Sequence, residues 1–294
     1  MKVQLTGATG FIGSNITKLI KAYFIPLKIT LSDPYTINAD IFIHLAGLAH
    51  DLDVNMSTND YYTINTVLTK KAFDAFLVSN AKKFILLSSV KAVLNESDSI
   101  ITEDTIECPS TNYGKSKLEA DNYILSQELP KDKFFYILRP ALITGPGVKG
   151  NMLKLYNFSN QPFNCLFSSI NNQRSFCNIL NLSYVIEQII NRNDIPSGIY
   201  LLSDNETIST SNIITELSSK KLKPSYFSNF SASLFKILLR FDKLMGNKVF
   251  FRSLRTLTSD YVISNLKITK VLGYSLPFSS LDGVRSIKNK LNDL

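Results

Sequence analysis

The stretch Thr6-Gly7-Ala8-Thr9-Gly10-Phe11-Ile12-Gly13 begins at the sixth residue and decides the fold. It follows a short apolar segment typical of a strand and precedes apolar residues at helical spacing. Gly7 permits a tight turn, Gly10 lets the backbone approach a phosphate, and Gly13 lets the helix pack close to the strand. The N-terminus of that helix presents free N–H groups to a pyrophosphate. The stretch therefore predicts a dinucleotide-binding turn.

A second motif, Tyr113-Gly114-Lys115-Ser116-Lys117, opens another predicted helix about a hundred residues later. A helix places Tyr113 and Lys117 on one face, one turn apart. A free tyrosine has a pKa of about 10, too high for a base at neutral pH. An adjacent ammonium favours the phenolate and lowers that pKa, so the pair suits proton transfer to or from a carbinol.

The remaining pattern alternates apolar strands with amphipathic helices. We expect strands near residues 3–5, 27–31, 41–47, 84–87 and 134–138, with a helix over about 61–79 between the third and fourth. This alternation predicts an α/β fold, a doubly wound parallel sheet of the Rossmann type. We expect residues 1–145 plus about 179–203 to form the dinucleotide-binding domain. A smaller discontinuous α/β substrate lobe would comprise about 146–178 plus 204–294.

Composition bounds the function. The chain has 294 residues, a net charge of +8 and three cysteines, which are too few for a disulfide framework. Met1 leads straight into the first predicted strand, so we expect no secretory leader and a cytoplasmic protein. No nucleic-acid module is recognisable, and no apolar run reaches the roughly 18–20 residues of a membrane span. The cysteines and the two histidines, His44 and His50, fit no metal pattern, so we expect no metal. His44 falls in an apolar run and is expected to be structural.

One stretch, residues 230–244, combines apolar residues at helical spacing with Lys236, Arg240 and Lys243. Such a basic amphipathic helix can lie on a membrane surface. Packing of its apolar face on the second lobe explains the same pattern more simply, so peripheral membrane contact is the less favoured interpretation.

Taken together, these motifs resemble the extended short-chain dehydrogenase/reductases, in the branch of NAD-dependent epimerases and dehydratases that act on nucleotide sugars. The resemblance rests on the glycine stretch, the run from Asp40 to Gly47, Asn65, Ser88-Ser89 and the Tyr113–Lys117 motif. Leu138-Arg139-Pro140 and Arg174-Ser175-Phe176 extend it in the same order, so it covers essentially the whole chain. It implies NAD as the cofactor, with NADP not excluded, and a homodimer with a nucleotide-sugar substrate, of UDP type in the first instance.

The resemblance also implies roles for individual residues. Family register favours Ser89 over Ser88 as the hydroxyl that bonds the reacting oxygen, so the catalytic set is Ser89, Tyr113 and Lys117. The cofactor would contact Gly7, Thr9, Gly10, Phe11, Ile12, Gly13, Asp33, Leu45, Ala46, Gly47, Asn65, Ser88, Tyr113, Lys117 and Pro140. The substrate would contact Ser89, Asn151 and Arg174, with His50 within reach of the sugar.

Two features depart from the family pattern. Asp33 lies at the right distance to bind the ribose 2′-hydroxyl and select NAD, but Pro34 follows it and Ser32 competes for the position. The segment from Leu31 to Asp40 is short, so we expect one strand common in the family to be missing.

The pair Val90-Lys91 argues against one of the family's reactions, the 4,6-dehydration of a nucleotide sugar. The 4,6-dehydratases resemble one another in carrying Asp-Glu directly after the catalytic hydroxyl residue, and Val90-Lys91 cannot transfer those protons. Of the two reactions that remain, a nucleotide-sugar C4 epimerase that keeps its NAD is slightly favoured, because the resemblance implies C4 inversion as the commonest chemistry of this branch. A reductase of a nucleotide-4-keto-6-deoxy sugar that consumes NAD(P)H is the alternative. A non-catalytic NAD(P)-sensing protein is less favoured, because such proteins typically lack the tyrosine or the lysine.

Overall fold

The computed structural model describes residues 1–28, 30–32, 35–48, 57–148, 151–161, 170–218 and 257–292. In this part of the chain six parallel strands form one sheet in the order β2-β1-β3-β4-β5-β8. The chain starts at β1, moves outward to β2 and then returns to the other side of β1 at β3. The expected doubly wound α/β class is confirmed. The strands are β1 (Lys2–Thr6), β2 (Tyr23–Pro26), β3 (Ile41–His44), β4 (Lys83–Leu87), β5 (Phe134–Pro140) and β8 (Gly198–Leu202).

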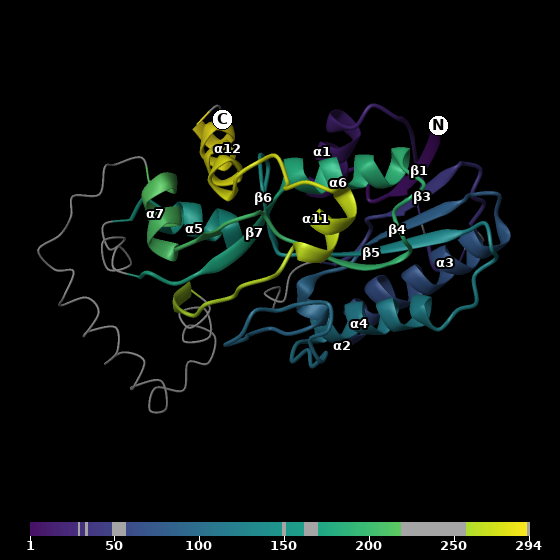
Figure 1. The fold of residues 1–294 in the computed structure, drawn as a ribbon, viewed down its shortest axis with the longest axis horizontal. Coiled ribbons are helices and arrows are strands. Elements are labelled where there is room, and N and C mark those ends of the chain that lie inside the picture. The colour runs from purple at the N-terminus through teal and green to yellow at the C-terminus, as the bar shows by residue number, and fades with distance from the viewer. Residues whose placement is uncertain are drawn as a thin grey trace, which may run out of the picture.

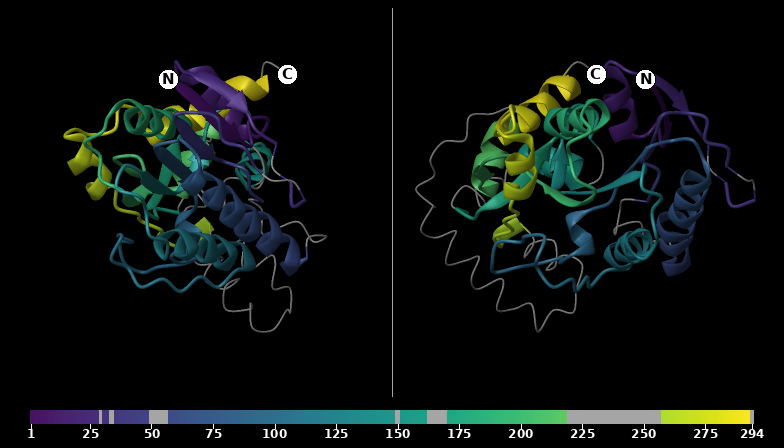
Figure 2. Two further views of the ribbon diagram at one scale, coloured as in Figure 1. Left: turned by 90° about the vertical axis from the view of Figure 1, so that its right-hand side faces the viewer. Right: turned by 45° about the vertical axis from the view of Figure 1, so that its right-hand side comes forward.

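Helices cover both faces of this sheet (Figure 1). One face carries α1 (Phe11–Leu19) and α6 (Ile179–Asn191), and the other carries α3 (Leu68–Val78) and α4 (Asn112–Leu125), as the turned views also show (Figure 2). Strand β3 is buried throughout, and its side chains alternate between the two layers. Its isoleucines join the apolar cluster under α1 and α6, whereas Phe42 joins an aromatic cluster under α3 and α4.

A smaller sheet lies beside the large one and consists of β6 (Leu142–Thr144), β7 (Arg174–Asn178) and β9 (Thr207–Ile208). Strand β6 pairs parallel with β7, and β9 pairs antiparallel with it. Helices α5 (Asn151–Ser159), α7 (Thr210–Leu217) and α12 (Ser280–Asn292) surround a separate apolar cluster at this sheet, while α11 (Leu266–Leu272) lies against β8. Within the described ranges no helix has the length and apolarity to cross a membrane.

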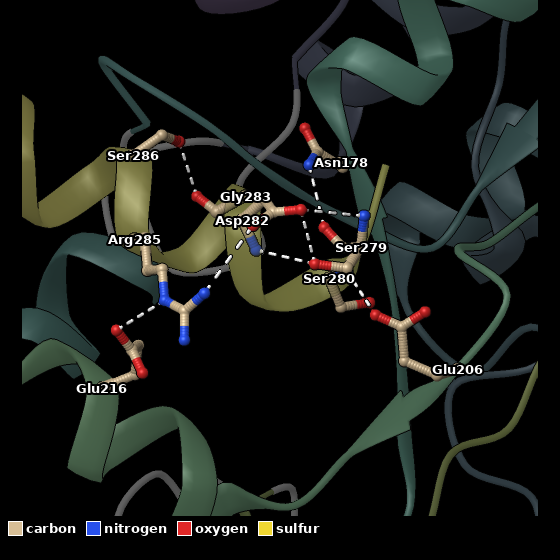
Figure 3. Close-up of polar contacts among 9 residues, drawn as sticks. All are labelled: Asn178, Glu206, Glu216, Ser279, Ser280, Asp282, Gly283, Arg285 and Ser286. Atoms are coloured by element: carbon tan, nitrogen blue, oxygen red, sulfur yellow. Dashed lines mark hydrogen bonds and ion pairs between the residues drawn. The ribbon is translucent and has the colours of Figure 1, made fainter. Parts of the chain in front are cut away.

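Helix α12 joins the small sheet through its N-terminus (Figure 3). The Ser279 hydroxyl donates to the Asp282 carboxylate at 2.7 Å, and the Asp282 N–H donates back to Ser279 at 3.1 Å, which forms a reciprocal cap. A Cβ at Gly283 would lie 2.2 Å from Thr144 Oγ1, so only glycine allows this close approach to β6. Arg285 donates to Glu216 of α7 at 2.9 Å and ties α12 to the next helix.

Two expectations about local structure need correction. The second strand was expected at residues 27–31 but is β2, because the chain turns back directly after α1 and pairs Tyr23–Pro26 with β1. Pro26 has no N–H to donate, and the last ladder bond comes from Leu27 to Leu5 at 2.8 Å. The helix expected over 61–79 starts earlier and is interrupted: α2 (Thr58–Tyr61) leads into a π-helical turn, Tyr62–Val67, before α3.

One strand common in the family was expected to be missing between Leu31 and Asp40. The described residues between β2 and β3 form no strand, in agreement with that expectation. The basic amphipathic stretch 230–244 lies outside the described residues, as do Asp33 and His50.

A buried lysine closes the end of α3. The Lys133 ammonium donates to the carbonyls of Phe76, Ser79 and Ala81 at 2.8, 2.7 and 2.8 Å. Carbonyls at a helix C-terminus lack partners within the helix, and a cation there also interacts favourably with the helix dipole. Burial lowers the pKa of Lys133, yet all three hydrogen bonds require its donors.

We expect Lys133→Met to lower the free energy of unfolding by about 2–3 kcal/mol, because it leaves these buried carbonyls without a donor. Lys131→Met, two residues earlier and exposed, is the matched control and should unfold like the wild type. Urea denaturation of both variants measures the difference. Equal stability of the two variants would show that the Lys133 cap contributes nothing.

Candidate active site

The candidate site lies at the carboxyl edge of the large sheet, where the strand order reverses between β1 and β3. Ligands of open α/β sheets bind at such a reversal point. The loops that follow four neighbouring strands contain most of the residues singled out from the sequence. The glycine stretch follows β1, Leu45–Gly47 follows β3, Ser88-Ser89 follows β4, and Pro140 ends β5.

The glycine turn after β1 has the close contacts that the sequence predicted. Gly7 has φ +72°, and a Cβ there would lie 2.9 Å from the Ala46 backbone nitrogen. A Cβ at Gly13 would lie 2.2 Å from the Gly7 carbonyl oxygen, so α1 can begin this close to β1 only with glycine. Thr9 and Gly10 are exposed, whereas Phe11 and Ile12 are half-buried.

The N-terminus of α1 is open to an anion. Its N-cap residue is Gly10, which provides no side-chain hydrogen bond, and its first turn contains no acidic residue. The first N–H groups of a helix have no partner within the helix and favour negative charge. The turn therefore combines free donors, exposure and a close backbone approach, which are the requirements of a pyrophosphate site.

A buried chain of hydrogen bonds connects this turn with the loop after β3. The Ala46 N–H donates to Thr6 Oγ1 at 3.1 Å, and Thr6 Oγ1 lies 2.8 Å from His44 Nδ1. On the other side of the ring, His44 Nε2 lies 3.1 Å from Thr69 Oγ1, which donates to the Asn65 carbonyl at 2.7 Å. The chain thus runs from the edge of the sheet to the π-helical turn.

These partners determine the tautomer of His44. The Thr69 hydroxyl donates its one hydrogen to the Asn65 carbonyl. It can therefore only accept from His44, so Nε2 of the ring carries the hydrogen. Nδ1 is then the bare nitrogen and accepts from the Thr6 hydroxyl. Complete burial and the nearby Lys117 ammonium lower the pKa of His44 to about 3, so the ring is neutral at physiological pH. The expectation that His44 is structural is confirmed.

Asn65 holds the loop after β3 in place. Its Oδ1 accepts from the Leu48 N–H at 2.8 Å, and its Nδ2 donates to the Leu48 carbonyl at 3.1 Å and to Ser116 Oγ at 3.0 Å. A Cβ at Gly47 would lie 3.0 Å from both Asn65 Oδ1 and Lys117 Nζ. Asn65 lies in the π-helical turn, a feature that is frequent at functional sites. The structure therefore brings Gly47, Asn65 and Lys117 together.

Lys117 is the buried cation of the site. Its ammonium donates to the Leu87 carbonyl, the last residue of β4, at 2.9 Å. Burial lowers the pKa of Lys117 to about 8, and the Asp121 carboxylate one turn further along α4 opposes that fall. Lys117 is therefore still mostly an ammonium at neutral pH, and it loses its charge as the pH rises through about 8.

Behind Lys117 lies an ionic network that the sequence interpretation missed. Asp121 Oδ2 accepts from Ser88 Oγ and from Arg139 Nε, each at 2.8 Å, and Arg139 pairs with Glu107 on its other side. Burial raises the pKa of Asp121, and Arg139, Ser88 and Lys117 oppose that rise. The spacing of Lys117 and Asp121 on one helix face was the available signal.

The Ser88 hydroxyl is thus bonded to a carboxylate on α4, while its N–H donates to the Leu138 carbonyl at 2.8 Å. Its expected contact with the cofactor stays a prediction. Ser89 instead begins the short helical turn η2 (Val90–Ala92), where its Oγ accepts from the Lys91 N–H at 3.2 Å.

The start of α4 lies directly on the turn that follows Ser89. A Cβ at Gly114 would lie 2.3 Å from the Lys91 carbonyl oxygen and 2.9 Å from Pro109 Cβ. Gly114 is therefore the contact residue that lets Tyr113 lie close to the Ser89 turn. The Tyr113 ring is half-buried and meets the buried Tyr61 ring edge-on at 6.5 Å between centroids.

Two residues expected to contact substrate lie in the smaller sheet and its helices. Arg174 begins β7 and donates from Nη1 to the Ser259 carbonyl at 3.2 Å. Burial lowers the pKa of Arg174, and Tyr261 and Asp260 oppose that change. Asn151 is the first residue of α5, and its side chain lies outside the described residues.

The edge of the sheet therefore fits a dinucleotide on this chain's own geometry. The glycine cradle would be filled by a Cβ at Gly7 or Gly13, and the N-terminus of α1 has neither a side-chain cap nor an acidic residue in its first turn. Gly47, Asn65 and Lys117 form the next wall of the same edge.

Comparisons with known proteins agree with this geometry. The NAD dependent epimerase/dehydratase family matches residues 34–200. A UDP-glucose 4-epimerase of Vibrio cholerae is 28% identical over 315 aligned residues, covering 96% of this chain and 93% of that protein.

Solved structures share the fold. RMD from Pseudomonas aeruginosa, complexed with NADPH, superposes with a TM-score of 0.71 at 15% identity over 99% of both chains. UDP-glucuronic acid 4-epimerase from Bacillus cereus, in complex with NAD, gives a TM-score of 0.69 at 17% identity over 100% of this chain and 97% of that one.

The fold and the order of residues along the sheet edge define an α/β protein with a doubly wound sheet of the dinucleotide-binding type. The chain belongs to the NAD dependent epimerase/dehydratase family and is an NAD(P)-dependent enzyme of that family.

The neutral state of His44 makes stability depend on pH. In the unfolded chain His44 has a pKa of about 6.5 and binds a proton below that pH, whereas in the folded chain it stays neutral down to about pH 3. The free energy of unfolding therefore decreases as the pH falls below about 6.5. We expect the free energy of unfolding of the wild type to fall relative to His44→Gln between pH 7 and 5, by up to about 1.4 kcal/mol per pH unit. Denaturant melts across that range measure it. A difference that does not change with pH would show that His44 titrates equally in both states.

Gly114 gives a second prediction. Alanine normally stabilises a helix interior relative to glycine by about 1 kcal/mol, but here its Cβ must displace the Lys91 carbonyl. We expect Gly114→Ala to destabilise the fold by about 1–3 kcal/mol and to weaken catalysis. The exposed neighbour Lys115→Ala is the control. Stabilisation by Gly114→Ala in thermal melts would contradict the contact.

Proposed function

We propose that this chain is an NAD-dependent nucleotide-sugar C4 epimerase of the UDP-hexose or UDP-N-acetylhexosamine type. One observation carries the proposal: a buried ammonium, Lys117, lies one helical turn after Tyr113, at the strand end that leads to Ser89. The V. cholerae relative supports the reaction type, because it is named a UDP-glucose 4-epimerase.

The proposed chemistry starts at the C4 hydroxyl of the sugar. Tyr113, one helical turn before Lys117, would take the hydroxyl proton, and Ser89 would donate a hydrogen bond to the same oxygen as charge develops. NAD bound at the glycine turn supplies a hydride acceptor and donor. The 4-keto sugar would then turn to present its other face, the hydride removed from C4 would return to that face, and Tyr113 would return the proton to the oxygen of the inverted product.

The proposed binding roles follow the layout of the site. The pyrophosphate of the cofactor would lie on Gly7 and Thr9–Gly13, with Leu45–Gly47, Asn65, Ser88 and Pro140 along the remainder of the dinucleotide. Asp33 would bind the adenosine ribose and favour NAD over NADP. Arg174 would pair with the substrate diphosphate, because a guanidinium makes two parallel hydrogen bonds to phosphate oxygens, and Asn151 would contact the substrate nearby.

The proposal includes the wider organisation. Residues 1–145 plus about 179–203 would hold the cofactor, and about 146–178 plus 204–294 would hold the nucleotide sugar. The protein would work in the cytoplasm as a homodimer.

An alternative is reduction of a nucleotide-4-keto-6-deoxy sugar with NAD(P)H. The turn after Ser89 favours both reactions over dehydration, because Val90 and Lys91 provide no carboxylate for proton transfer at C5 and C6. Epimerisation needs no net cofactor, whereas reduction consumes NAD(P)H in equal amount, so the two reactions separate by cofactor balance.

We expect purified protein to interconvert UDP-glucose or UDP-N-acetylglucosamine with its C4 epimer without added reductant, as followed by NMR. Tyr113→Phe should lower turnover by about 10²–10⁴-fold while NAD(H) binding stays near that of the wild type. Tyr123→Phe is the matched control, since Tyr123 lies on the same helix with its hydroxyl bonded to Asp74 of α3.

Three results would point elsewhere. Full activity of Tyr113→Phe removes the tyrosine from the mechanism. Turnover only with a 4-keto-6-deoxy sugar and stoichiometric NAD(P)H identifies the reductase. NAD(P) binding without turnover of any nucleotide sugar in a panel analysed by mass spectrometry identifies a sensing protein.

A further inference from the structure

Tyr261 connects the strand that contains Arg174 with the turn that contains Ser89. On the side of the small sheet, the Tyr261 N–H donates to the Gln173 carbonyl at 2.8 Å, and its carbonyl accepts from the Ser175 N–H at 2.9 Å. These two bonds bracket Arg174, so the Tyr261 backbone is paired with β7 directly beside it. The Arg174 guanidinium lies 6.0 Å from the centre of the Tyr261 ring.

The side chain of Tyr261 reaches in the other direction. Its hydroxyl donates to the Leu94 carbonyl at 2.6 Å, and the Lys91 ammonium lies 4.2 Å from the ring centre. Both partners belong to the segment that follows Ser89, in which the Leu94 N–H donates to the Val90 carbonyl at 3.3 Å. The phenol of Tyr261 therefore contacts this turn through one hydrogen bond, to Leu94, and one cation–π contact, with Lys91.

The same turn also positions the start of α4. Lys91 donates from its ammonium to the Asn95 carbonyl at 2.8 Å, and Asn95 Nδ2 donates to Thr111 Oγ1, the N-cap of α4, at 3.3 Å. The Lys91 carbonyl is the surface on which Gly114 lies. The contacts of Tyr261 thus continue through Lys91 and Asn95 to the start of the helix that contains Tyr113.

Tyr261 is suited to a fixed role because it is buried and stays protonated. Only 6% of the residue is exposed, and burial raises its pKa far above the physiological range. Its hydroxyl is therefore a permanent donor. The ring also faces two cations, and its negative π-face attracts both.

We propose that Tyr261 is a positioning residue that sets the span between Arg174 and the Ser89–Tyr113 pair. It would do so by holding β7, through its backbone, and the turn after Ser89, through its hydroxyl and ring, at a fixed separation. This inference rests on the proposed function.

Two substitutions separate the contribution of the Tyr261 hydroxyl from that of its ring. Tyr261→Phe keeps the ring for Lys91 and Arg174 but loses the bond to Leu94, so binding of UDP should stay within about twofold while kcat falls about five- to tenfold. Tyr261→Leu also removes the ring, so the affinity for UDP should fall about tenfold in addition. Calorimetry with UDP and NAD, and steady-state kinetics with the UDP-sugar, give these values.

Tyr200 provides a matched control. It is also buried, its hydroxyl donates to the Pro196 carbonyl at 2.6 Å, and the Lys267 ammonium lies 5.0 Å from its ring centre. Tyr200→Phe removes the same kind of bond at a distance from the site. If Tyr200→Phe and Tyr261→Phe change kcat, KM and UDP affinity equally, Tyr261 is merely structural and the inference is overturned.

A readout without turnover separates this inference from the epimerase proposal. We expect UDP to slow amide hydrogen exchange over residues 89–95 of the wild type, and this protection to be lost in Tyr261→Phe but kept in Tyr200→Phe. That result supports the positioning role even if no epimerisation occurs. Equal protection in all three proteins overturns the positioning role whether or not the wild type is an epimerase.

Discussion

The buried hydrogen bond from Lys117 to the Leu87 carbonyl is the contact on which the remaining site depends. It ties α4 to the end of β4, and a charge taken out of water requires such partners around it. The Asp121 carboxylate, one turn further along the helix, offsets the positive charge of Lys117. Asn65 and Gly47 also lie beside the Lys117 ammonium. The sheet edge, the π-helical turn and α4 therefore meet at one ammonium.

Close backbone approach is the second constraint, and glycine allows it in three places. Gly13 lets α1 begin against β1, Gly114 lets α4 lie on the Ser89 turn, and Gly283 lets α12 lie on β6. In each case an added Cβ would come within 2.3 Å of an oxygen atom. Helix propensity alone disfavours glycine at all three positions, which lie inside α1, α4 and α12, so packing decides their identity.

Two buried titratable side chains at this edge, His44 and Lys117, have different charge states because their surroundings differ. His44 is kept neutral by complete burial and by the nearby Lys117 ammonium, while Thr6 donates to one ring nitrogen and Thr69 accepts from the other. Lys117, also buried, keeps its charge near neutral pH because a carbonyl and a carboxylate lie beside it. A neutral donor–acceptor chain on one side and a charged network on the other thus hold the same loops.

Local sequence determined the glycine turn, the strand alternation and the tyrosine–lysine spacing, because each depends on residues within one helix turn or one strand. It was wrong about β2, since pairing with β1 outweighed the apolar run at residues 27–31. Only the tertiary structure decided that Ser88 bonds Asp121, that Gly114 meets Lys91 and that Tyr261 reaches Leu94. Those contacts join residues far apart in the chain, and their partners become neighbours only when the parallel strands place their ends along one edge.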